Sequence, residues 1–461
     1  MAITSNPLAN KSLADFAQDL RTGKITCQST VAIFIERIKK LNPKLDAVTE
    51  LCEEDAILIA KSIDSSLKAG KNLGPLAGLP VLVKDLYQVD HLPMTAGSRM
   101  DILDLVPKQE GPFIKELRKA GCIILGKTRT TEFAMGGFNL TRPVPWNPCD
   151  LNVKRMTGGS SHGSAVAMAA GLCSFALGTD TGGSVRQPAA FIGNVGYKAS
   201  RDYWPTEGVF PMSPGLDSLG IFTKSAMDAA WITSHLPFSK KFNSDFDELT
   251  LQKLSLGIPT HHIYDYCDNE TKKAFNLAIA RLKKAGVTLV SIEIPEVSEI
   301  DAVFGKVVPS DVLNFIGKER FISSKALLDP VVWARTSSAF DMKIKDYLET
   351  KKRITEISYV INDRLKNLDG WVCPTIPSSA GPVSSFNSVS KIAEWNRINT
   401  SNTRPGNLFN QCGISLPIIG QETGLPLGFQ IMCKSLDDEK MLKIACLIEK
   451  IICNQPSLEL E

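Results

Sequence analysis

The chain has 461 residues, which is long enough for two or three ordinary domains or for one large domain. Its 52 basic and 49 acidic side chains leave a net charge of only +3, so the composition gives no sign of a polyanionic partner such as nucleic acid. Hydrophobic residues make up 43% and charged residues 22%, as in ordinary globular proteins, and no run of 18 uncharged apolar residues predicts a membrane span.

Cysteine and histidine usage sets further limits. The 11 cysteines include no C-x-x-C pair, which favours reduced thiols in the cytoplasm over a disulfide framework or a zinc site. There are five histidines and no H-E-x-x-H motif, so we expect no metal and no cofactor. The N-terminus, MAITSNPLANKSLADF, lacks the basic and apolar regions of a signal peptide. We therefore expect a cytoplasmic protein.

The first 70 residues are predicted to form a helical layer that packs on the core. Apolar side chains recur at helical spacing from Val31 to Leu41, and Arg37 lies off that apolar face. Ser12, with Asp15 three residues later, matches the start of a helix.

A different pattern begins at residue 74, GPLAGLPVLVKDLYQVDHLPMTAGS. The apolar run Val81 to Val83 is bounded by Gly-Leu-Pro, which predicts a short buried strand. Lys84 ends this strand, and strand alternation places Asp85 on the opposite face. Asp85 is therefore not expected to neutralise Lys84.

Residues 112–146 are predicted to form a helix, a strand and a loop. FIKELRKAG reads as the helix with its glycine stop, CIILGKT as the strand, and TEFAMGGFNLTRPVPWNP as the loop. This alternation is typical of an α/β fold around a mixed or parallel sheet.

The stretch 156–191, MTGGSSHGSAVAMAAGLCSFALGTDTGGSVRQPAAF, contains two serine-bearing glycine turns. Glycine occurs where the backbone bends sharply or lies close to another group. A serine at such a turn can present its hydroxyl and nearby backbone N–H groups to one target. The N-terminus of the helix that follows the first turn supplies further free N–H groups. Two such turns, TGGSSHGS and TDTGGS, suggest one site built from both.

This stretch resembles the amidase signature family, whose members are serine hydrolases of amide bonds. GGSS at 158–161 followed by GTDTGGSVRQPAAF at 178–191 matches the signature at nearly full length, and GLPVLVKD resembles the second motif of the family. The resemblance implies that Ser184 is the nucleophile, Ser160 the bridging serine on a cis peptide with Gly159, and Lys84 the base. It also implies a small-molecule amide as substrate.

Further residues follow from the resemblance. The backbone N–H groups of Thr181, Gly182 and Gly183, with that of Ser184, would form the oxyanion hole. The family loop that lines the substrate pocket corresponds to GKTRTTEFAMGG, which makes Met135 and Gly136 candidates for substrate binding; packing of this loop on the site is the alternative.

The resemblance extends over most of the chain and implies one amidase-signature domain, 1–461, in which a central mixed β-sheet is covered by helices on both faces. Its parts would be a helical layer (1–70), a catalytic core (74–225), a variable region that forms part of the substrate pocket (235–365), and closing strands with a helix (366–450).

The chemistry is consistent with the residue types. A serine hydroxyl is nearly inert at neutral pH and needs a base, while a buried lysine without a carboxylate partner has a lowered pKa and can accept a proton. A second hydroxyl can donate and accept at once, so it can relay that proton.

Two other interpretations remain open. GSSHG at 159–163 also spells the G-x-S-x-G nucleophile elbow with Ser161 as nucleophile, although the polar residues before it do not predict the required strand. The chain could also be the A subunit of a tRNA-dependent amidotransferase, which works with partner subunits and releases ammonia from glutamine. Residues 330–350 lack the Tyr-Asp-Gly-rich stretch usual in such subunits, which favours a stand-alone amidase.

The sequence does not identify the amide, and it leaves a homodimer open. Departures from the family pattern lead us to expect that Tyr203 and Trp204 enlarge a loop facing the site and that His162 shapes its entrance. Arg129 and Arg142 could bind a substrate carboxylate, but we expect both to be exposed.

Overall fold

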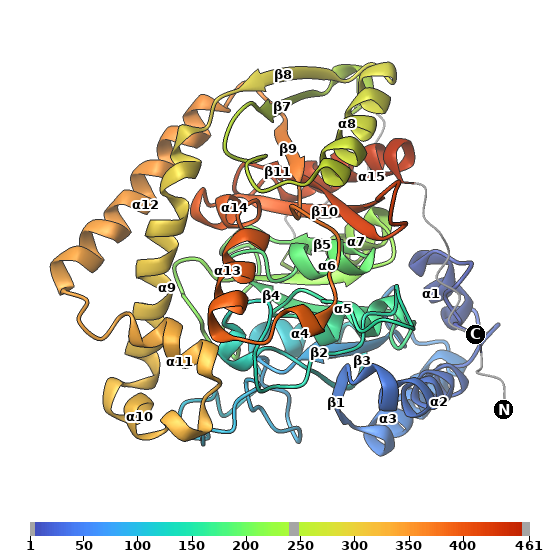
Figure 1. Cartoon of the computed structure of the whole chain (residues 1–461). Helices are drawn as coiled ribbons and strands as arrows, with labels where there is room; N and C mark the ends of the chain where they lie inside the picture. The colour runs from blue at the N-terminus through green and yellow to red at the C-terminus, as the bar shows by residue number, and fades with distance from the viewer. Residues whose placement is uncertain (1–4, 239–248, 454–461) are drawn as a thin grey trace.

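The computed structural model describes residues 5–238 and 249–453, and one continuous sheet runs through this part of the chain (Figure 1). In their order across the sheet, the strands are β1 (Val48–Leu51), β3 (Ile123–Thr128), β2 (Pro80–Lys84), β4 (Phe175–Asp180), β6 (Ser218–Thr223), β5 (Val195–Lys198), β10 (Cys412–Ile419), β11 (Pro426–Cys433), β9 (Gly370–Pro374), β7 (Ser255–Pro259) and β8 (Thr288–Ile292).

The sheet is mixed. Strand β2 is parallel to both of its neighbours, β3 and β4, and β7 is parallel to β8 and β9, whereas the remaining neighbours are antiparallel. The single sheet contains strands from both ends of the sequence. It therefore does not mark boundaries at residues 70, 235 and 366, and the division of the chain into four parts stays a prediction.

Helices pack around this sheet. In chain order they are α1 (Leu13–Arg21), α2 (Cys27–Leu45), α3 (Glu53–Lys68), α4 (Pro112–Lys119), α5 (His162–Ala169), α6 (Arg186–Ile192), α7 (Ala226–Ser234), α8 (Asn269–Lys284), α9 (Ile300–Ile316), α10 (Lys318–Ser323), α11 (Pro330–Ser337), α12 (Ile344–Arg364), α13 (Val389–Asn399), α14 (Arg404–Leu408) and α15 (Asp438–Ile452).

Both faces of the sheet are covered, as two neighbouring residues of β5 show. Gly196 faces α6, because a Cβ atom there would lie 2.6 Å from the Cβ of Ala189. The hydroxyl of Tyr197 donates to Asp438 Oδ1 of α15 at 2.7 Å. Successive residues of a strand point to opposite faces, so α6 and α15 lie on opposite sides. The predicted α/β fold with a mixed sheet between helices is confirmed.

The N-terminal layer differs from its prediction in two respects. The short edge strand β1 separates α2 from α3, and Gly126 of β3 allows its close approach, since a Cβ there would lie 1.9 Å from the carbonyl oxygen of Glu50. Arg37 is buried rather than turned away from the core, because its guanidinium donates to the carbonyl oxygens of Ala170 and Gly171 at 2.8 and 2.9 Å. The predicted cap is present: Ser12 Oγ accepts from the N–H of Asp15 at 3.1 Å.

Within the described residues, the helices that are long enough to cross a bilayer are too polar to do so, and the apolar ones are too short.

A buried ion pair joins the ends of β2 and β3. Lys127 Nζ lies 3.0 Å from Asp85 Oδ1, and it also donates to the carbonyl oxygens of Tyr87 and Pro93. Asp85 additionally accepts from the hydroxyl of Thr95 at 2.5 Å. The carboxylate that follows Lys84 in sequence is thus satisfied away from Lys84, as strand alternation predicted.

We expect the Asp85→Ala variant to lose about 3–5 kcal/mol of unfolding free energy, because it leaves the buried Lys127 ammonium without its partner. Chemical denaturation monitored by circular dichroism measures this loss. The matched control is Asp104→Ala, which breaks an exposed pair with Arg320 and should change stability far less. Equal losses of unfolding free energy in the two variants would contradict a stabilising role for the buried pair of Asp85 and Lys127.

Candidate active site

The site forms where β2 and β4 end side by side. The two strands are parallel neighbours, so their C-terminal ends meet at the same edge of the sheet. Lys84 is the last residue of β2, and Thr179 and Asp180 are the last residues of β4. Such an edge, between the strand ends and the loops that follow them, is where open α/β sheets bind ligands.

Lys84 is fully buried and is held by two hydroxyl groups. Its Nζ donates to Ser160 Oγ and to Thr179 Oγ1, both at 2.7 Å. Burial lowers the pKa of Lys84 to about 7, although the charges of Asp180 and Asp217 act in the opposite direction. Near neutral pH a large fraction of this amine is therefore uncharged and able to accept a proton.

The first glycine turn places Ser160 beside Lys84. The peptide bond between Gly159 and Ser160 is cis, the conformation that the resemblance implied. The N–H of Gly159 donates to Gln187 Oε1 at 3.1 Å, and a Cβ atom at this position would lie 2.8 Å from the carbonyl oxygen of Gly137. Glycine is therefore required here by close approach of two backbone segments.

The second glycine turn is folded around the carboxylate of Asp180. This carboxylate accepts from the N–H groups of Gly183 at 2.8 Å and Val185 at 3.1 Å, and from Arg186 Nη2 at 2.9 Å. Burial alone would raise the pKa of Asp180, but Arg186 and the surrounding donors hold it well below its usual range. Ser184 lies in the middle of this fixed turn.

One expected oxyanion donor is occupied. The N–H of Gly183 already donates to Asp180, so it does not point freely at a substrate. By contrast, no acceptor is found in the described part of the chain for the N–H groups of Thr181, Gly182 and Ser184. The predicted set thus reduces to Thr181 and Gly182, together with the N–H of Ser184 itself.

Ser184 lies on the wall of a narrow cleft. Its carbonyl oxygen accepts from the N–H of Ser161 at 3.3 Å, which ties the two glycine turns together. Among the described residues no hydrogen-bond partner is found for its hydroxyl, so the bond to Ser160 that a relay requires has yet to form. Catalytic hydrogen bonds are often longer before substrate is bound.

The loop predicted to line the pocket contributes one of its two candidates. Gly136 and its neighbour Ala134 line the cleft, together with Gly159 and Gly182. Met135 does not line the cleft: its side chain is buried in the core, where its sulfur accepts from the hydroxyl of Thr336 at 3.4 Å. The prediction of Met135 as a substrate contact is wrong, because the backbone turns it inward.

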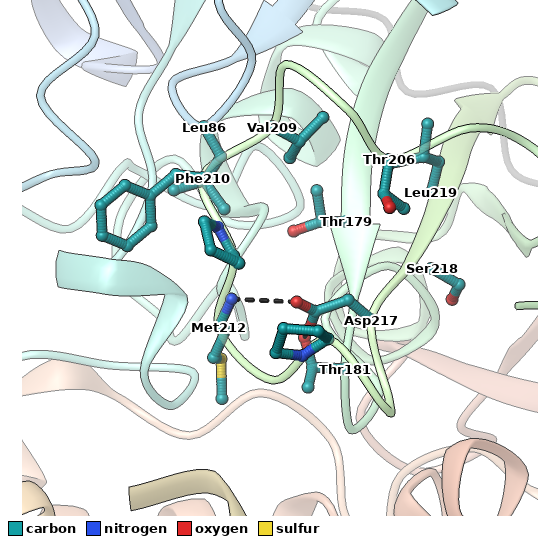
Figure 2. Close-up of a pocket in the computed structure, with 12 residues that line it drawn as sticks. Leu86, Thr179, Thr181, Thr206, Val209, Phe210, Met212, Asp217, Ser218 and Leu219 are labelled. Carbon is teal, nitrogen blue, oxygen red and sulfur yellow. Dashed lines mark hydrogen bonds between the residues drawn. The ribbon is translucent and has the colours of Figure 1, made fainter. Parts of the chain in front are cut away.

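A second opening lies beside the turn that carries Ser184 and shares Met212 with the first. Thr181 and Asp217 are on its wall, with Thr179 beside them (Figure 2). The hydroxyl of Thr181 donates to Asp217 Oδ1 at 2.5 Å, and Asp217 Oδ2 accepts from the N–H of Met212 at 2.9 Å, the dashed line in Figure 2. Met212 lines both openings, so it separates them.

The nucleophile-elbow interpretation of Ser161 is wrong. No strand precedes it, since residues 151–157 are irregular apart from one isolated bridge at Arg155. The hydroxyl of Ser161 donates to the carbonyl oxygen of Thr179 at 3.2 Å and accepts from its N–H at 3.3 Å. Ser161 therefore supports the end of β4.

Two further expectations are corrected. Trp204 is buried against the rings of Phe113 and Tyr197, with ring centroids 5.1 and 5.4 Å away, and Tyr203 packs against it at 6.0 Å. This loop therefore fills the core instead of facing the site. His162 is also buried, in the first turn of α5, and lies outside the set of side chains that line the cleft.

Sequence reasoning missed several residues of the site. Thr179, in the motif GTDTGGS, supplies a hydroxyl to Lys84, and only the motif itself could have pointed to it. The far wall of the cleft comes from segments without a recognisable motif: Phe304, Arg335, Asn396, Thr400 and Arg404.

Comparison with known proteins agrees with this geometry. The family model described as Amidase matches residues 29–442. The chain is 32% identical to the 2-amino-5-chloromuconic acid deaminase of Comamonas testosteroni, a match covering 96% of each chain. It is 30% identical to the A subunit of the glutamyl-tRNA(Gln) amidotransferase of Desulfotalea psychrophila, over 96% of this chain and 98% of that one.

A solved structure leads to the same family. A crystal structure of an amidase superposes with a TM-score of 0.85 at 27% identity, over 95% of this chain and 99% of that chain. Because the family model spans nearly the whole chain and the relatives match it end to end, the chain belongs to the amidase signature family and is an amide-hydrolysing enzyme.

Proposed function

We propose that the chain hydrolyses the C–N bond of a small carboxylic amide through an acyl-enzyme on Ser184, with Ser160 as the bridging serine and Lys84 as the base. The observation that supports this most directly is the buried Lys84, which is bonded to Ser160 and has its pKa lowered to about 7 beside the cleft that contains Ser184. An amine in this state can take up the proton that a serine nucleophile must lose.

In the acylation step, Ser184 Oγ attacks the amide carbonyl carbon while its proton passes through Ser160 to Lys84. The negative charge that develops on the carbonyl oxygen is met by the N–H groups of Thr181, Gly182 and Ser184. The C–N bond then breaks, and the leaving amine receives the proton back from Lys84 through Ser160. Water attacks the acyl group in the same way, which releases the acid and restores the serine hydroxyl.

The alternative, an amidotransferase component that releases ammonia from glutamine, uses the same chemistry. Glutamine carries an ammonium group, which needs a carboxylate or several oxygen acceptors when it leaves water. No aspartate or glutamate is among the described residues that line the cleft. We therefore favour a stand-alone amidase, for which partner subunits are not required.

Localisation and assembly are part of the proposal. We place the protein in the cytoplasm, supported by its 11 cysteines, all of which are free in the structure, since cytoplasmic thiols remain reduced. A homodimer stays a prediction, which light scattering of the purified protein would test.

We expect a fluorophosphonate to label Ser184, because the probe reacts with activated serine nucleophiles, and mass spectrometry of the digested protein locates the adduct. Ser184→Ala should abolish labelling, and Lys84→Ala and Ser160→Ala should slow it by about 10²–10⁴-fold, the usual contribution of proton transfer. Ser161→Ala is the matched control, one residue from Ser160 but outside the relay. An adduct on Ser161 would instead support the elbow.

We expect kcat/KM for amide hydrolysis to rise with pH through a midpoint near 7 and to level off above it. The sign follows from Lys84, which acts as a base only in its neutral form and whose pKa is lowered to about 7. A pH–rate profile of the wild type, compared with Lys84→Ala, measures this limb, which the variant should lack. A profile that falls between neutral and mildly alkaline pH would refute the base assignment.

A further inference from the structure

Two arginines from separate helices line the cleft at Ser184. Arg335 extends from α11 and Arg404 from the start of α14. Both guanidinium groups lie over the ring of Phe304 on α9, with their Cζ atoms 5.5 and 4.8 Å from the ring centroid. The aromatic ring therefore holds two cations close together on one wall of the cleft.

The positive charge on this wall is not balanced. Arg404 forms an ion pair with Asp301, which also contacts Arg397 Nη1 at 3.2 Å, so one carboxylate serves two guanidinium groups. No ion pair of Arg335 is found within residues 5–238 and 249–453. Since the cleft is also lined by no described acidic residue, it presents an excess of positive charge beside the nucleophile.

The remaining hydrogen-bonding capacity of the two side chains leads to the same conclusion. Nε of Arg404 is buried without a partner in the described structure. Burial, together with the nearby charge of Arg404, lowers the pKa of Arg335 to about 9, which leaves Arg335 charged at neutral pH in an unfavourable setting. A bound anion would give Nε of Arg404 an acceptor and would balance the charge of Arg335, because guanidinium groups bind carboxylates through paired, charge-assisted hydrogen bonds.

The arginines considered from the sequence are already neutralised. Arg129 pairs with Asp46, and Arg142 pairs with the buried Glu132, so neither is fully exposed as expected and neither lines the cleft. These two pairs show what the chain does with a structural arginine. Unlike these two arginines, Arg335 has no ion pair with any of the described residues.

We propose that the substrate is an amide that carries a carboxylate, bound by Arg335 and Arg404 while its carbonyl group lies against Ser184. This inference rests on the proposed function of Ser184 and names the substrate class of the same site. The cleft is narrow, so the substrates that we would test are monoamides of short dicarboxylic acids, such as succinamate and glutaramate. Hydrolysis of glutaramate by water gives glutarate and ammonia.

The neutral diamide is the matched comparison compound, because glutaramide differs from glutaramate only in an uncharged carboxamide where the carboxylate stands. We expect the wild type to hydrolyse glutaramate with a kcat/KM about 10- to 100-fold above that of glutaramide, the factor that one charge-assisted hydrogen-bond set contributes. Glutamine, which adds an ammonium group, should be a poorer substrate than glutaramate. Ammonia release measures all three reactions.

Binding is tested separately from turnover by protection of Ser184 against the fluorophosphonate. Glutaramate and succinamate should protect at concentrations at least tenfold lower than their diamides. Arg335→Gln should remove most of this difference, and Arg335→Lys, which keeps the charge, should restore part of it. Arg320→Gln, which removes an exposed arginine paired with Asp104, should keep both the preference and the activity of the wild type.

The outcomes separate the two proposals. If Ser184 is labelled but monoamides and diamides protect and react equally, or if Arg335→Gln leaves their ratio unchanged, the carboxylate inference is wrong and the acyl-enzyme proposal stands. If Ser184 is not labelled and no amide is hydrolysed, the proposed function fails, and the inference fails with it. Thermal unfolding of each variant shows that a lost preference does not come from a lost fold.

Discussion

The buried ion pair between Asp180 and Arg186 fixes the turn on which the chemistry depends. The carboxylate of Asp180 accepts hydrogen bonds from two backbone N–H groups and from the guanidinium of Arg186. Arg186 Nη1 also donates to Gln430 on β11, and its Nη2 donates to Asn407 on α14. A buried charge pair is tolerated when hydrogen bonds satisfy its remaining polar atoms, as they do here. Because the donors are already placed, the turn around Ser184 does not need to reorganise when charge develops on a substrate.

Two fully buried lysines at neighbouring strand ends illustrate how environment assigns a role. Lys127 on β3 is neutralised by Asp85 and binds two carbonyl oxygens, so it joins loops together. Lys84 on β2 meets only hydroxyl groups, and no described carboxylate lies within ion-pair distance of it. The same side chain is thus ion-paired in one position and, among the described residues, has no carboxylate within ion-pair distance in the other, because Asp85, which follows Lys84 in sequence, pairs with Lys127.

The local patterns of this chain predicted most of the fold and the centre of the site. The strand at Val81 to Val83 and the helix that begins at Pro112 formed as expected, because apolar runs and helical spacing act over a few residues. β1 was hidden because it is four residues long between two helices and is stabilised only by pairing with β3. Arg335 and Arg404 could not be foreseen, since they lie far apart in sequence and meet only through tertiary packing on Phe304. The N–H of Gly183 was expected to be a free oxyanion donor but bonds Asp180, because the direction of one N–H group depends on the fold of the turn.

The hydroxyl of Thr403 donates to the carbonyl oxygen of Gly182 at 2.7 Å, and Gln187 Nε2 donates to that of Asn399 at 2.9 Å. Together with the bonds of Arg186, these contacts attach the serine-bearing turn to a segment more than 200 residues further along the chain. The amidase signature segment therefore does not hold its active conformation without the C-terminal half of the chain. Excised with its own strands alone, it would keep every residue of the proposed triad yet expose Arg186 and lose the supports that aim Ser184. Substitutions at Asn399, Thr403 or Gln430 would accordingly act on a turn that lies more than 200 residues earlier in the chain.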